Sequence, residues 1–535
     1  MKKLLFLLLL LPFISHAQPD YKKDIYIKDK RCFDYDMGYY YMKKVGNRIF
    51  GVTQSFPSGD AKLIIMNLNF DTIKTVNYGG SSTIDELKTI NELSNDNILL
   101  SGRSASDDGD VNGPANRAAQ MWFLEVDTNG IIKKSKTIGG TQGSACLNVT
   151  IAKDGFIYCI GATNANDYDF QRSLWYGPFA SDIVIFKLDT AYNIVWNKIF
   201  TTAKEEGGGA IVEGANNTFI FSWSCEDTAT SVLGSQAKGY WDVFTIQVDS
   251  AGNELRKYRW GGNQTDGNIG LYYDSINYRY YYIGFSHSSN TDATYRTGQS
   301  GIMNLWIRIT DTNFNMLYSK CYGSDKWFNN GFINLKSTFY QGNLWFSLQP
   351  YVQKGDFLTN DNPNDSTDNL VIGIIDTSAN LIGKMGIKSN VTIQVDKLLE
   401  INNELYAVGV TGGTSGTIIN NFGCGSDTTD WKYFVLKLGE APLSIKENTK
   451  TTQANLFTFF PNPTSVELNI KWNENYIGKN YHLAIYSQEG KKLNSYNGVC
   501  ESSNVVMPIS NFANGKYIIK ATINKQIQTQ SFIKQ

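Results

Sequence analysis

The chain has 535 residues, with 49 basic and 50 acidic side chains and a formal net charge of −1. Charges that nearly cancel give no electrostatic reason to expect nucleic acid or an acidic lipid surface as a partner. The 31 tyrosines, 29 phenylalanines and 48 glycines favour an all-β protein, because strands and tight turns use these residues.

The first 17 residues have the pattern of a secretion signal. Lys2 and Lys3 form the positive end, residues 4–14 the apolar core, and Ser15-His-Ala17 the small-residue cleavage site. An apolar run of this length is too short to cross a bilayer core, so we expect cleavage after Ala17 rather than a membrane anchor. No later segment is long and apolar enough to span a membrane. The sequence therefore predicts an exported protein without a transmembrane segment.

One pattern returns between residues 22 and 438: a strand, a turn built on aspartate, and a second strand. In its clearest copy, residues 182–198, two runs of β-branched and aromatic residues flank Asp189-Thr-Ala-Tyr-Asn. The predicted turn aspartates are Asp71, Asp127, Asp189, Asp249, Asp311 and Asp376, spaced 56 to 65 residues apart. A period of this length indicates a repeat architecture.

Each repeat divides into four strands, lettered a to d from the inside outward. In the third repeat they are residues 146–152, 156–161, 182–188 and 193–200. Strand b often ends in Gly-x-Ser/Thr, as at Gly51-Val-Thr and Gly102-Arg-Ser, and strand d in a glycine pair, as at Trp260-Gly-Gly. Four short strands repeated around a ring make a β-propeller, which leaves few strand edges exposed.

The two ends of the repeat array predict seven blades. Residues 22–28 resemble a strand d with no strand before it, and residues 431–438 resemble a strand c with no strand d after it. Together they complete one blade and close the ring. We therefore predict an all-β fold, with a signal peptide at 1–17, a seven-bladed β-propeller at 18–438, a linker at 439–456 and a small β-sandwich at 457–535.

The repeat unit resembles the kelch-type and related propeller repeats of secreted bacterial proteins. It is also similar to quinoprotein propellers, which place a tryptophan just after the Asp-turn. Only Trp196 has that position, while Lys133, Leu255, Leu317 and Ile382 stand in comparable places. No cofactor is therefore expected.

The tail carries four short motifs in a fixed order: Phe460-Pro-Asn-Pro-Thr-Ser465, Ile485-Tyr-Ser-Gln-Glu-Gly-Lys491, Asn514-Gly-Lys-Tyr-Ile-Ile-Lys520 and Phe532-Ile-Lys534. They closely resemble the C-terminal sorting domain (type A-like) of the type IX secretion system of Bacteroidetes. The positions that carry the resemblance are Phe460, Pro461, Asn462, Pro463, Gly490, Gly515, Tyr517 and Lys534. The resemblance implies the type IX secretion machinery as partner and export across the outer membrane. Release or attachment at the outer-membrane surface would follow once the tail is cut.

Histidine is scarce, which limits the possible chemistry. His16 leaves with the signal and His482 lies in the tail, so the propeller keeps only His287. This excludes a multi-histidine metal centre, and a Ser-His-Asp triad would have to use His287. The acidic run 107–112 could offer oxygens to calcium, but its spacing does not match the EF-hand loop. No metal site is predicted.

The long b–c loops are the predicted ligand-binding face. They cover residues 103–120, 162–181, 224–240, 286–303, 349–368 and 411–430 and open on one side of the ring. The aromatics assigned to this binding face are Trp175, Tyr176, Tyr240, Tyr295, Tyr351 and Phe422. We expect a non-catalytic binding or adhesion module for a glycan or peptide ligand. The alternative is a carboxylate-dependent glycan hydrolase or lyase on the same face.

Overall fold

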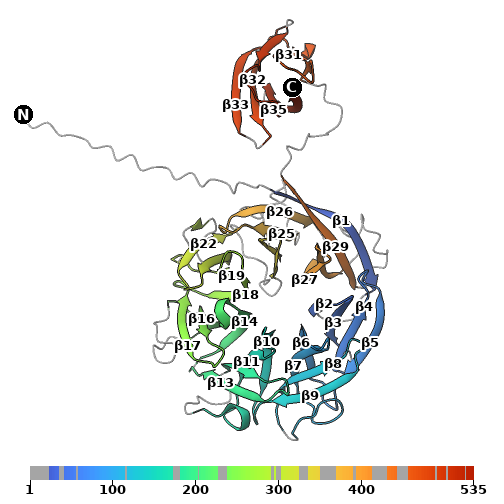
Figure 1. Cartoon of the computed structure of the whole chain (residues 1–535), viewed down its shortest axis with the longest axis vertical. Helices are drawn as coiled ribbons and strands as arrows, with labels where there is room; N and C mark the ends of the chain where they lie inside the picture. The colour runs from blue at the N-terminus through green and yellow to red at the C-terminus, as the bar shows by residue number, and fades with distance from the viewer. Residues whose placement is uncertain are drawn as a thin grey trace, which may run out of the picture. The chain divides into compact units, whose positions relative to one another are not determined.

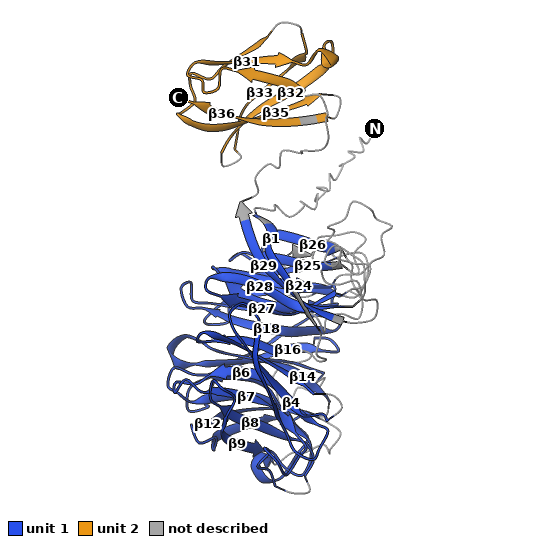
Figure 2. Cartoon of the chain, turned by 90° about the vertical axis from the view of Figure 1, so that its right-hand side faces the viewer, with its two compact units in different colours: residues 1–442 blue, residues 443–535 orange. Residues whose placement is uncertain are grey.

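The structure, a computed structural model, describes residues 23–34, 41–55, 58–114, 117–172, 181–202, 204–226, 238–290, 295–296, 303–323, 335–349, 369–388, 393–412, 431–442, 456–488, 491–501, 504–523 and 526–535. The chain divides into two compact units, residues 1–442 and 443–535 (Figure 2). Within the described part of the chain, no helix is long and apolar enough to cross a membrane. The helical segments among the described residues are the single 3₁₀ turns η1 (Tyr168–Phe170), η2 (Ala215–Asn217) and η4 (Glu474–Tyr476).

The first unit is built from antiparallel sheets set around a central opening (Figure 1). The first sheet contains β2 (Tyr41–Val45), β3 (Arg48–Gln54), β4 (Ala61–Met66) and β5 (Thr72–Tyr78). The second contains β6 (Asp85–Glu92), β7 (Ile98–Ser104), β8 (Gln120–Val126) and β9 (Ile132–Ile138). The third contains β10 (Ser144–Ile151), β11 (Ile157–Thr163), β12 (Asp182–Leu188) and β13 (Ile194–Phe200).

The following sheets repeat this order. The fourth contains β14 (Glu206–Glu213), β15 (Phe219–Cys225), β16 (Asp242–Val248) and β17 (Glu254–Trp260). The fifth contains β18 (Asp266–Asp274), β19 (Arg279–Ser286), β21 (Asn304–Asp311) and β22 (Met316–Tyr322), with β20 (Tyr295–Arg296) added beyond β22. An eight-stranded sheet follows. One half contains β23 (Lys336–Tyr340), β24 (Asn343–Leu348), β25 (Asn369–Ile375) and β26 (Leu381–Lys388); the other contains β27 (Ile393–Ile401), β28 (Glu404–Gly412), β29 (Trp431–Pro442) and β1 (Lys23–Asp34).

The first strand of the chain pairs with the last strand of this unit. β1 runs antiparallel to β29 through eleven residue pairs, from Lys23↔Pro442 to Asp34↔Lys432. It also pairs briefly in parallel with β26, which joins the two halves of the eight-stranded sheet. The two predicted strands therefore pair with each other, but in a shifted register: residues 23–27 lie opposite 438–442, and residues 27–34 lie opposite 432–438. Both strands are longer than expected, and β29 extends to Pro442, into the segment predicted as linker.

Apolar side chains are buried mainly between neighbouring sheets. The third strand of a sheet, such as β8, β12 or β16, is buried at every position. One core cluster joins Ile160 and Ile185 of the third sheet to Phe221 and Ile246 of the fourth. Each sheet therefore depends on its neighbours for a complete core.

The turn between strands c and d is a hydrogen-bonded ring centred on one side chain. Asp189 Oδ1 accepts the N–H groups of Ala191 and Asn193, both at 2.9 Å, and Oδ2 accepts from Asn193 Nδ2 at 3.1 Å. These bonds favour the charged form of the carboxylate and hold the pKa of Asp189 below its usual value. The bond from the Asn193 backbone N–H has the largest effect. Asp249, Asp311 and Asp376 make the same set.

The first sheet reverses the chemistry of this turn. Asn67 Oδ1 accepts the N–H groups of Asn69 and Asp71 at 2.9 and 3.0 Å, and Asn67 Nδ2 donates to Asp71 Oδ2 at 2.9 Å. Asn67 thus has the role of Asp189, and Asp71 the role of the closing Asn193. The prediction that Asp71 is the turn aspartate is wrong, because an Asn–Asp pair forms the same ring with donor and acceptor exchanged.

Side chains of each sheet also bind the turn of the next. Tyr78 Oη donates to Gly130 O at 2.7 Å, and Trp196 Nε1 donates to Ser250 O at 3.2 Å. The Trp196 indole packs against Gly252, where an added Cβ would lie 2.8 Å from the ring. Contact between sheets therefore accounts for this tryptophan.

Glycine at the end of strand b makes room for an irregularity in strand a. Gly102 lies opposite a β-bulge between Leu87 and Thr89, and an added Cβ would lie 2.0 Å from Glu86 O. Gly161, Gly284 and Gly409 have equivalent neighbours. In the first sheet the register places Thr53 rather than Gly51 at this position, and the part of the inner strand opposite Thr53 lies outside the described residues.

The second unit consists of two sheets around one core. One contains β30 (Phe457–Phe460), β31 (Glu467–Trp472) and β34 (Val505–Pro508). The other contains β32 (Asn480–Ser487), β33 (Lys492–Val499), β35 (Gly515–Ile523) and β36 (Gln526–Lys534). Leu468 and Ile470 from the first sheet are buried with Leu483 and Ile519 from the second, as in a β-sandwich.

We predict that removing residues 18–34 from the mature chain destabilises the first unit. β29 would keep β28 on one side but lose β1 on the other side along the whole strand. The edge of β29 that is freed in this way could pair with another molecule. Thermal denaturation should show a lower Tm, and size-exclusion chromatography should show self-association. A control deletion of residues 18–22, which precede β1, should change neither. Unchanged Tm and a monomeric profile in the longer deletion would contradict the structural role of β1.

Candidate functional site

The predicted aromatic face is only partly described. Trp175, Tyr176, Tyr351 and Phe422 lie outside the described residues. Tyr240 is 72% exposed just before β16. Tyr295 lies in β20, which pairs with β22 at the edge of the fifth sheet opposite the inner strand β18. These two described positions do not by themselves define a ligand site.

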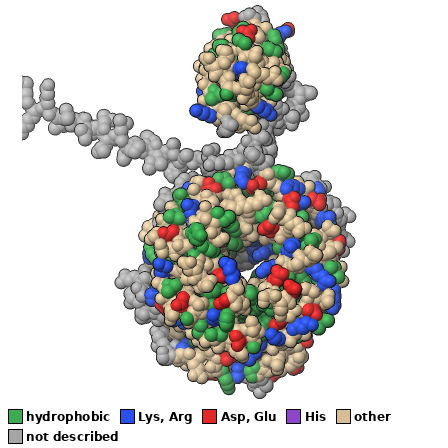
Figure 3. Space-filling view, viewed as in Figure 1, with side chains coloured by type: hydrophobic (Ala, Val, Ile, Leu, Met, Phe, Trp, Pro, Cys, Tyr) green, Lys and Arg blue, Asp and Glu red, His purple; other side chains and the backbone are tan. Residues whose placement is uncertain are grey.

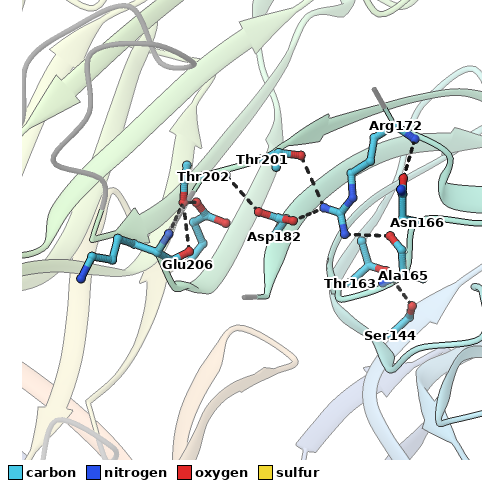
Figure 4. Close-up of polar contacts among 10 residues, drawn as sticks. Ser144, Thr163, Ala165, Asn166, Arg172, Asp182, Thr201, Thr202 and Glu206 are labelled. Carbon is cyan, nitrogen blue, oxygen red and sulfur yellow. Dashed lines mark hydrogen bonds and ion pairs between the residues drawn. The ribbon is translucent and has the colours of Figure 1, made fainter. Parts of the chain in front are cut away.

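The loop that carries Trp175 and Tyr176 has a firmly bonded base (Figure 4). Arg172, the last described residue before it, forms a buried ion pair with Asp182 at the start of β12. Arg172 also donates to Ala165 O at 2.7 Å, and Asp182 accepts the Thr202 N–H at 3.0 Å. Burial raises the pKa of Asp182, while the charge of Arg172 opposes that shift. This network orders both ends of the loop without offering a free functional group.

The acidic run at 107–112 binds backbone of the preceding sheet. Asp108 Oδ1 accepts the Ser81 N–H at 2.6 Å, and Asp110 Oδ2 accepts the Gly79 N–H at 3.3 Å. Among the described residues, no group of three or more His, Cys, Asp or Glu side chains is arranged to hold a metal ion. These carboxylates therefore have a structural role: they hold the backbone around the Gly79-Gly80 pair against the loop that carries the acidic run.

Serines that follow the Gly-x-Ser motif by two residues have a similar task. Ser106 Oγ donates to Asp85 Oδ2 at 2.9 Å, and Ser288 Oγ donates to Asp266 Oδ2 at 2.7 Å. His287 precedes Ser288, and its backbone N–H donates to Thr265 O at 3.0 Å. Burial lowers the pKa of the His287 imidazole. The histidine is thus built into the contact between loop and strand.

Three lysines on neighbouring inner strands form the most unusual charged group of the first unit. Lys43 lies on β2, Lys336 on β23 and Lys397 on β27, and we call them the lysine cluster. β27 packs against both β2 and β23. Both faces of these inner strands meet neighbouring sheets, so we infer that solvent reaches the half-buried lysines from the central opening. Figure 3 shows that Lys and Arg side chains gather at this opening, with Asp and Glu side chains among them.

Strand register shows that the lysines are not a general feature of the repeat. Lys336 pairs with Ser347 and Lys397 with Val408, at equivalent levels of β23 and β27. The residues at this level of the other inner strands are Tyr41, Thr89, Asn148, Ala210 and Gly270. Lys43 lies two residues beyond Tyr41. At this level of the inner strands a lysine is therefore found only on β23 and β27 among the described residues, and the other inner strands have uncharged residues there.

The lysine cluster is electrostatically unfavourable. Burial, followed by the charges of Lys43 and Lys336, lowers the pKa of Lys397 to about 8. Burial also lowers the pKa of Lys43 and of Lys336, although Glu92 opposes the shift of the first and Asp396 that of the second. Among the described residues, no ion pair holds any of the three ammonium groups.

Asp396 provides a buried carboxylate beside these lysines. It forms the bulge of β27, between Val395 and Lys397, and is 6% exposed. Its Oδ1 accepts from Gln394 Nε2 at 2.8 Å, but its Oδ2 is buried without a hydrogen-bond partner. Burial raises the pKa of Asp396 to about 6, against the effect of the Gln394 bond and of Lys336. A single carboxylate leaves the cluster with an excess of positive charge.

Sequence reasoning missed this cluster because it searched for histidines, paired carboxylates and loop aromatics. A signal was present in Val395-Asp-Lys-Leu398, where two adjacent charges lie between apolar residues of an inner strand. Its partners Lys43 and Lys336 lie far away in sequence. The cluster becomes visible only once the neighbouring strands are known.

In the second unit, the two ends of the sorting motifs meet. Asn462 Oδ1 accepts the Ile533 N–H at 2.9 Å, and the Thr464 N–H donates to Ile533 O at 2.8 Å. Tyr517 stacks on the buried Phe532 with ring centroids 5.6 Å apart. These motif residues therefore stabilise the sandwich itself.

The remaining sorting positions are spread over the same fold. Phe460 ends β30 and is 46% exposed, Pro461 and Pro463 follow it, Gly515 begins β35, Lys534 ends β36 and is 8% exposed, and Gly490 lies outside the described residues. The predicted cleavage residue Ala17 also lies outside them.

Comparison with protein families identifies the tail. Residues 458–535 match the family described as "Secretion system C-terminal sorting domain". This agrees with the type IX resemblance of the tail motifs and indicates export to the cell surface or the extracellular space. No match to a propeller family accompanies it, so the kelch-like resemblance of the repeats remains a prediction. No curated protein sequence matches the chain.

Solved structures similar to the chain share little sequence with it. A member of the DUF4221 family from Bacteroides vulgatus has a TM-score of 0.35 and 9% identity, covering 79% of this chain and 99% of that one. The β-propeller domain of the Trilobed protease from Pyrococcus furiosus has a TM-score of 0.36 and 10% identity, covering 69% and 91%. Drosophila Plexin A in complex with Semaphorin 1b has a TM-score of 0.37 and 9% identity, covering 80% and 89%. Similarity at this level does not bear on what the chain binds.

We predict that Lys397→Met stabilises the protein at pH 7, by on the order of 1–3 kcal/mol. The pKa of Lys397 is lower in the folded state than in the unfolded chain, so its charge opposes folding. That penalty is complete below pH 8 and fades as the pH rises toward the ordinary lysine value, so the gain should shrink toward pH 10. Denaturation with urea from pH 6 to 10 measures it.

The matched control is Lys153→Met, because the Lys153 side chain is 84% exposed. It should change stability little at any pH. A gain for Lys397→Met that stays constant up to pH 10, or no gain at pH 7, would contradict the electrostatic assignment.

Proposed function

We propose that the chain is an exported protein whose first unit is a seven-bladed β-propeller acting outside the cell as a non-catalytic binding or adhesion module. The blades would be the five sheets from β2 to β22, the group β23–β26, and β27–β29 completed by β1. Signal removal after Ala17 would start export, and the type IX secretion machinery would complete it through the tail. A kelch-like origin of the repeats and a source in Bacteroidetes are part of this proposal.

The observation that carries the proposal is the match of residues 458–535 to the sorting-domain family. A domain of this kind directs its cargo to the exterior, and the cargo here is the ring of sheets. The proposal places the mature protein in the extracellular space or on the outer-membrane surface, after loss of the tail near the segment 443–455.

Two features of the first unit support binding rather than catalysis. The face built from the b–c loops carries the proposed contact residues Trp175, Tyr176, Tyr240, Tyr295, Tyr351 and Phe422. The wall of the central opening carries the lysine cluster, which suits an acidic ligand. A glycan hydrolase needs two carboxylates that are free to act, whereas Glu86 on β6 is paired with Lys88 and Arg103 at 3.2 and 2.9 Å.

We predict that Phe532→Ala stops export. Phe532 is fully buried in the sandwich core, so its loss should lower the stability of the tail by about 3–5 kcal/mol. Cell fractionation with an antibody against the propeller should find the variant, like a deletion of residues 457–535, in the periplasm. Ile533→Ala is the matched control, because Ile533 is 45% exposed and bonds through its backbone. Normal export of the deletion variant would contradict the sorting role.

A glycan and peptide array with the purified mature protein tests the binding module. Hits should be retained without being cleaved when each is incubated with the protein and analysed by mass spectrometry. If a hit is turned over, and turnover disappears when one carboxylate is changed to its amide, the first unit is a glycan hydrolase or lyase and not a non-catalytic binding module.

A further inference from the structure

The lysine cluster has no explanation in the fold. At the same level of the other inner strands the ring accepts a tyrosine, a threonine, an asparagine, an alanine and a glycine. Uncharged residues therefore build an adequate inner strand. Burial lowers the pKa of all three half-buried lysines, and Lys43 and Lys336 lie close enough to Lys397 to lower its pKa further, so these charges disfavour folding. Such a cost is typical of a site that a ligand completes.

The charges around the cluster do not cancel within the protein. Asp396 is the buried carboxylate on the same strand, and it opposes the pKa shift of Lys336. Glu92 opposes that of Lys43. Glu86, on the neighbouring strand β6, is already paired with Lys88 and Arg103. The region around Lys397 therefore keeps an excess of positive charge that an anion would neutralise.

Asp396 adds an independent sign of an incomplete site. Its side chain is more than nine-tenths buried, yet Oδ2 has no hydrogen-bond partner. A buried oxygen in this condition is unfavourable unless something outside the chain donates to it. A partly protonated oxyanion, or a hydroxyl next to the anionic group, has such a donor.

We propose that Lys43, Lys336 and Lys397 bind a compact oxyanion, a phosphate or sulfate group, and that Asp396 Oδ2 accepts a hydrogen bond from a hydroxyl of the ligand, either the P–OH of hydrogen phosphate or a sugar hydroxyl beside an ester. The group is either a free inorganic ion or an ester on a sugar. This inference rests on the proposed binding function and specifies its ligand class. Three donors from neighbouring strands surround one small acceptor group, which favours a tetrahedral oxyanion over an extended polyanion.

Isothermal titration calorimetry with the full-length mature protein tests the proposal. The probes are inorganic phosphate, inorganic sulfate, a sugar phosphate and a sulfated monosaccharide, each titrated in chloride buffer of matched ionic strength. Wild-type protein should bind at least one of them. Tighter binding of an ester than of its inorganic ion would identify the sugar as part of the ligand, and equal binding would identify the free ion.

The variants assign the binding to this site. Lys397→Gln and Lys336→Gln should each weaken binding at least tenfold, because a charge-assisted bond is lost. Lys153→Gln, at the exposed position, should bind as the wild type does. If one cluster variant has a lower Tm than the wild type, the affinity of the other variant decides whether the lysines bind the anion. Either variant can serve alone, because each removes a single charge.

Two outcomes would overturn the inference: no binding of any probe by the wild type, or wild-type affinity in both cluster variants. These outcomes are separable from failure of the proposed function. Array hits that bind equally to Lys397→Gln would preserve the binding module and remove the oxyanion site. If oxyanion binding requires Lys397 but the array hits are hydrolysed, the oxyanion site is supported and the non-catalytic role is contradicted.

Discussion

The first unit depends on the hydrogen bonds that join the two ends of its chain. No sheet in this unit can bury both of its faces alone, because the core clusters lie between one sheet and the next. An open row of such sheets would leave an apolar face exposed at each end. Pairing β1 with β29 places the first residues of the unit beside the last ones and removes both exposed faces. The entropy of closing a long loop grows only slowly with its length, so eleven residue pairs and the core behind them can offset it.

The sequence predicted the parts of this arrangement that are local. Asp-turns such as Asp189-Thr-Ala-Tyr-Asn193 were predictable because one side chain bonds atoms two and four residues ahead. The partnership of β1 and β29 was predictable because each segment lacked a local partner. The first repeat was misread at Asp71 and Gly51 for a shared reason. Its turn exchanges Asn and Asp, and its strand register places Thr53 where other repeats have the glycine. A comparison by residue type therefore misaligns this repeat, whereas a comparison by strand register aligns it.

The candidate site shows the opposite behaviour. Loop aromatics were easy to select from the sequence, because long loops and large side chains are visible there. Lys43, Lys336 and Lys397 are ordinary residues of three different strands, separated by about sixty residues in one case and by almost three hundred in the other. Only the order of the sheets around the opening places them together. No pattern of spacing within one repeat contains that information, whereas an alignment of the inner strands by register does.

The position of the lysine cluster relates binding to closure of the ring. β2 follows β1 in the chain, whereas β23 and β27 belong to the last third of the first unit, so the cluster spans the junction that β1 and β29 complete. Repulsion among its ammonium groups acts against that junction, and Asp396 relieves it only in part. An anion held there would bind the closed ring and not an open one, and would stabilise closure in proportion to its affinity and concentration. The residues that oppose closure in the free protein would then be those through which a ligand strengthens it.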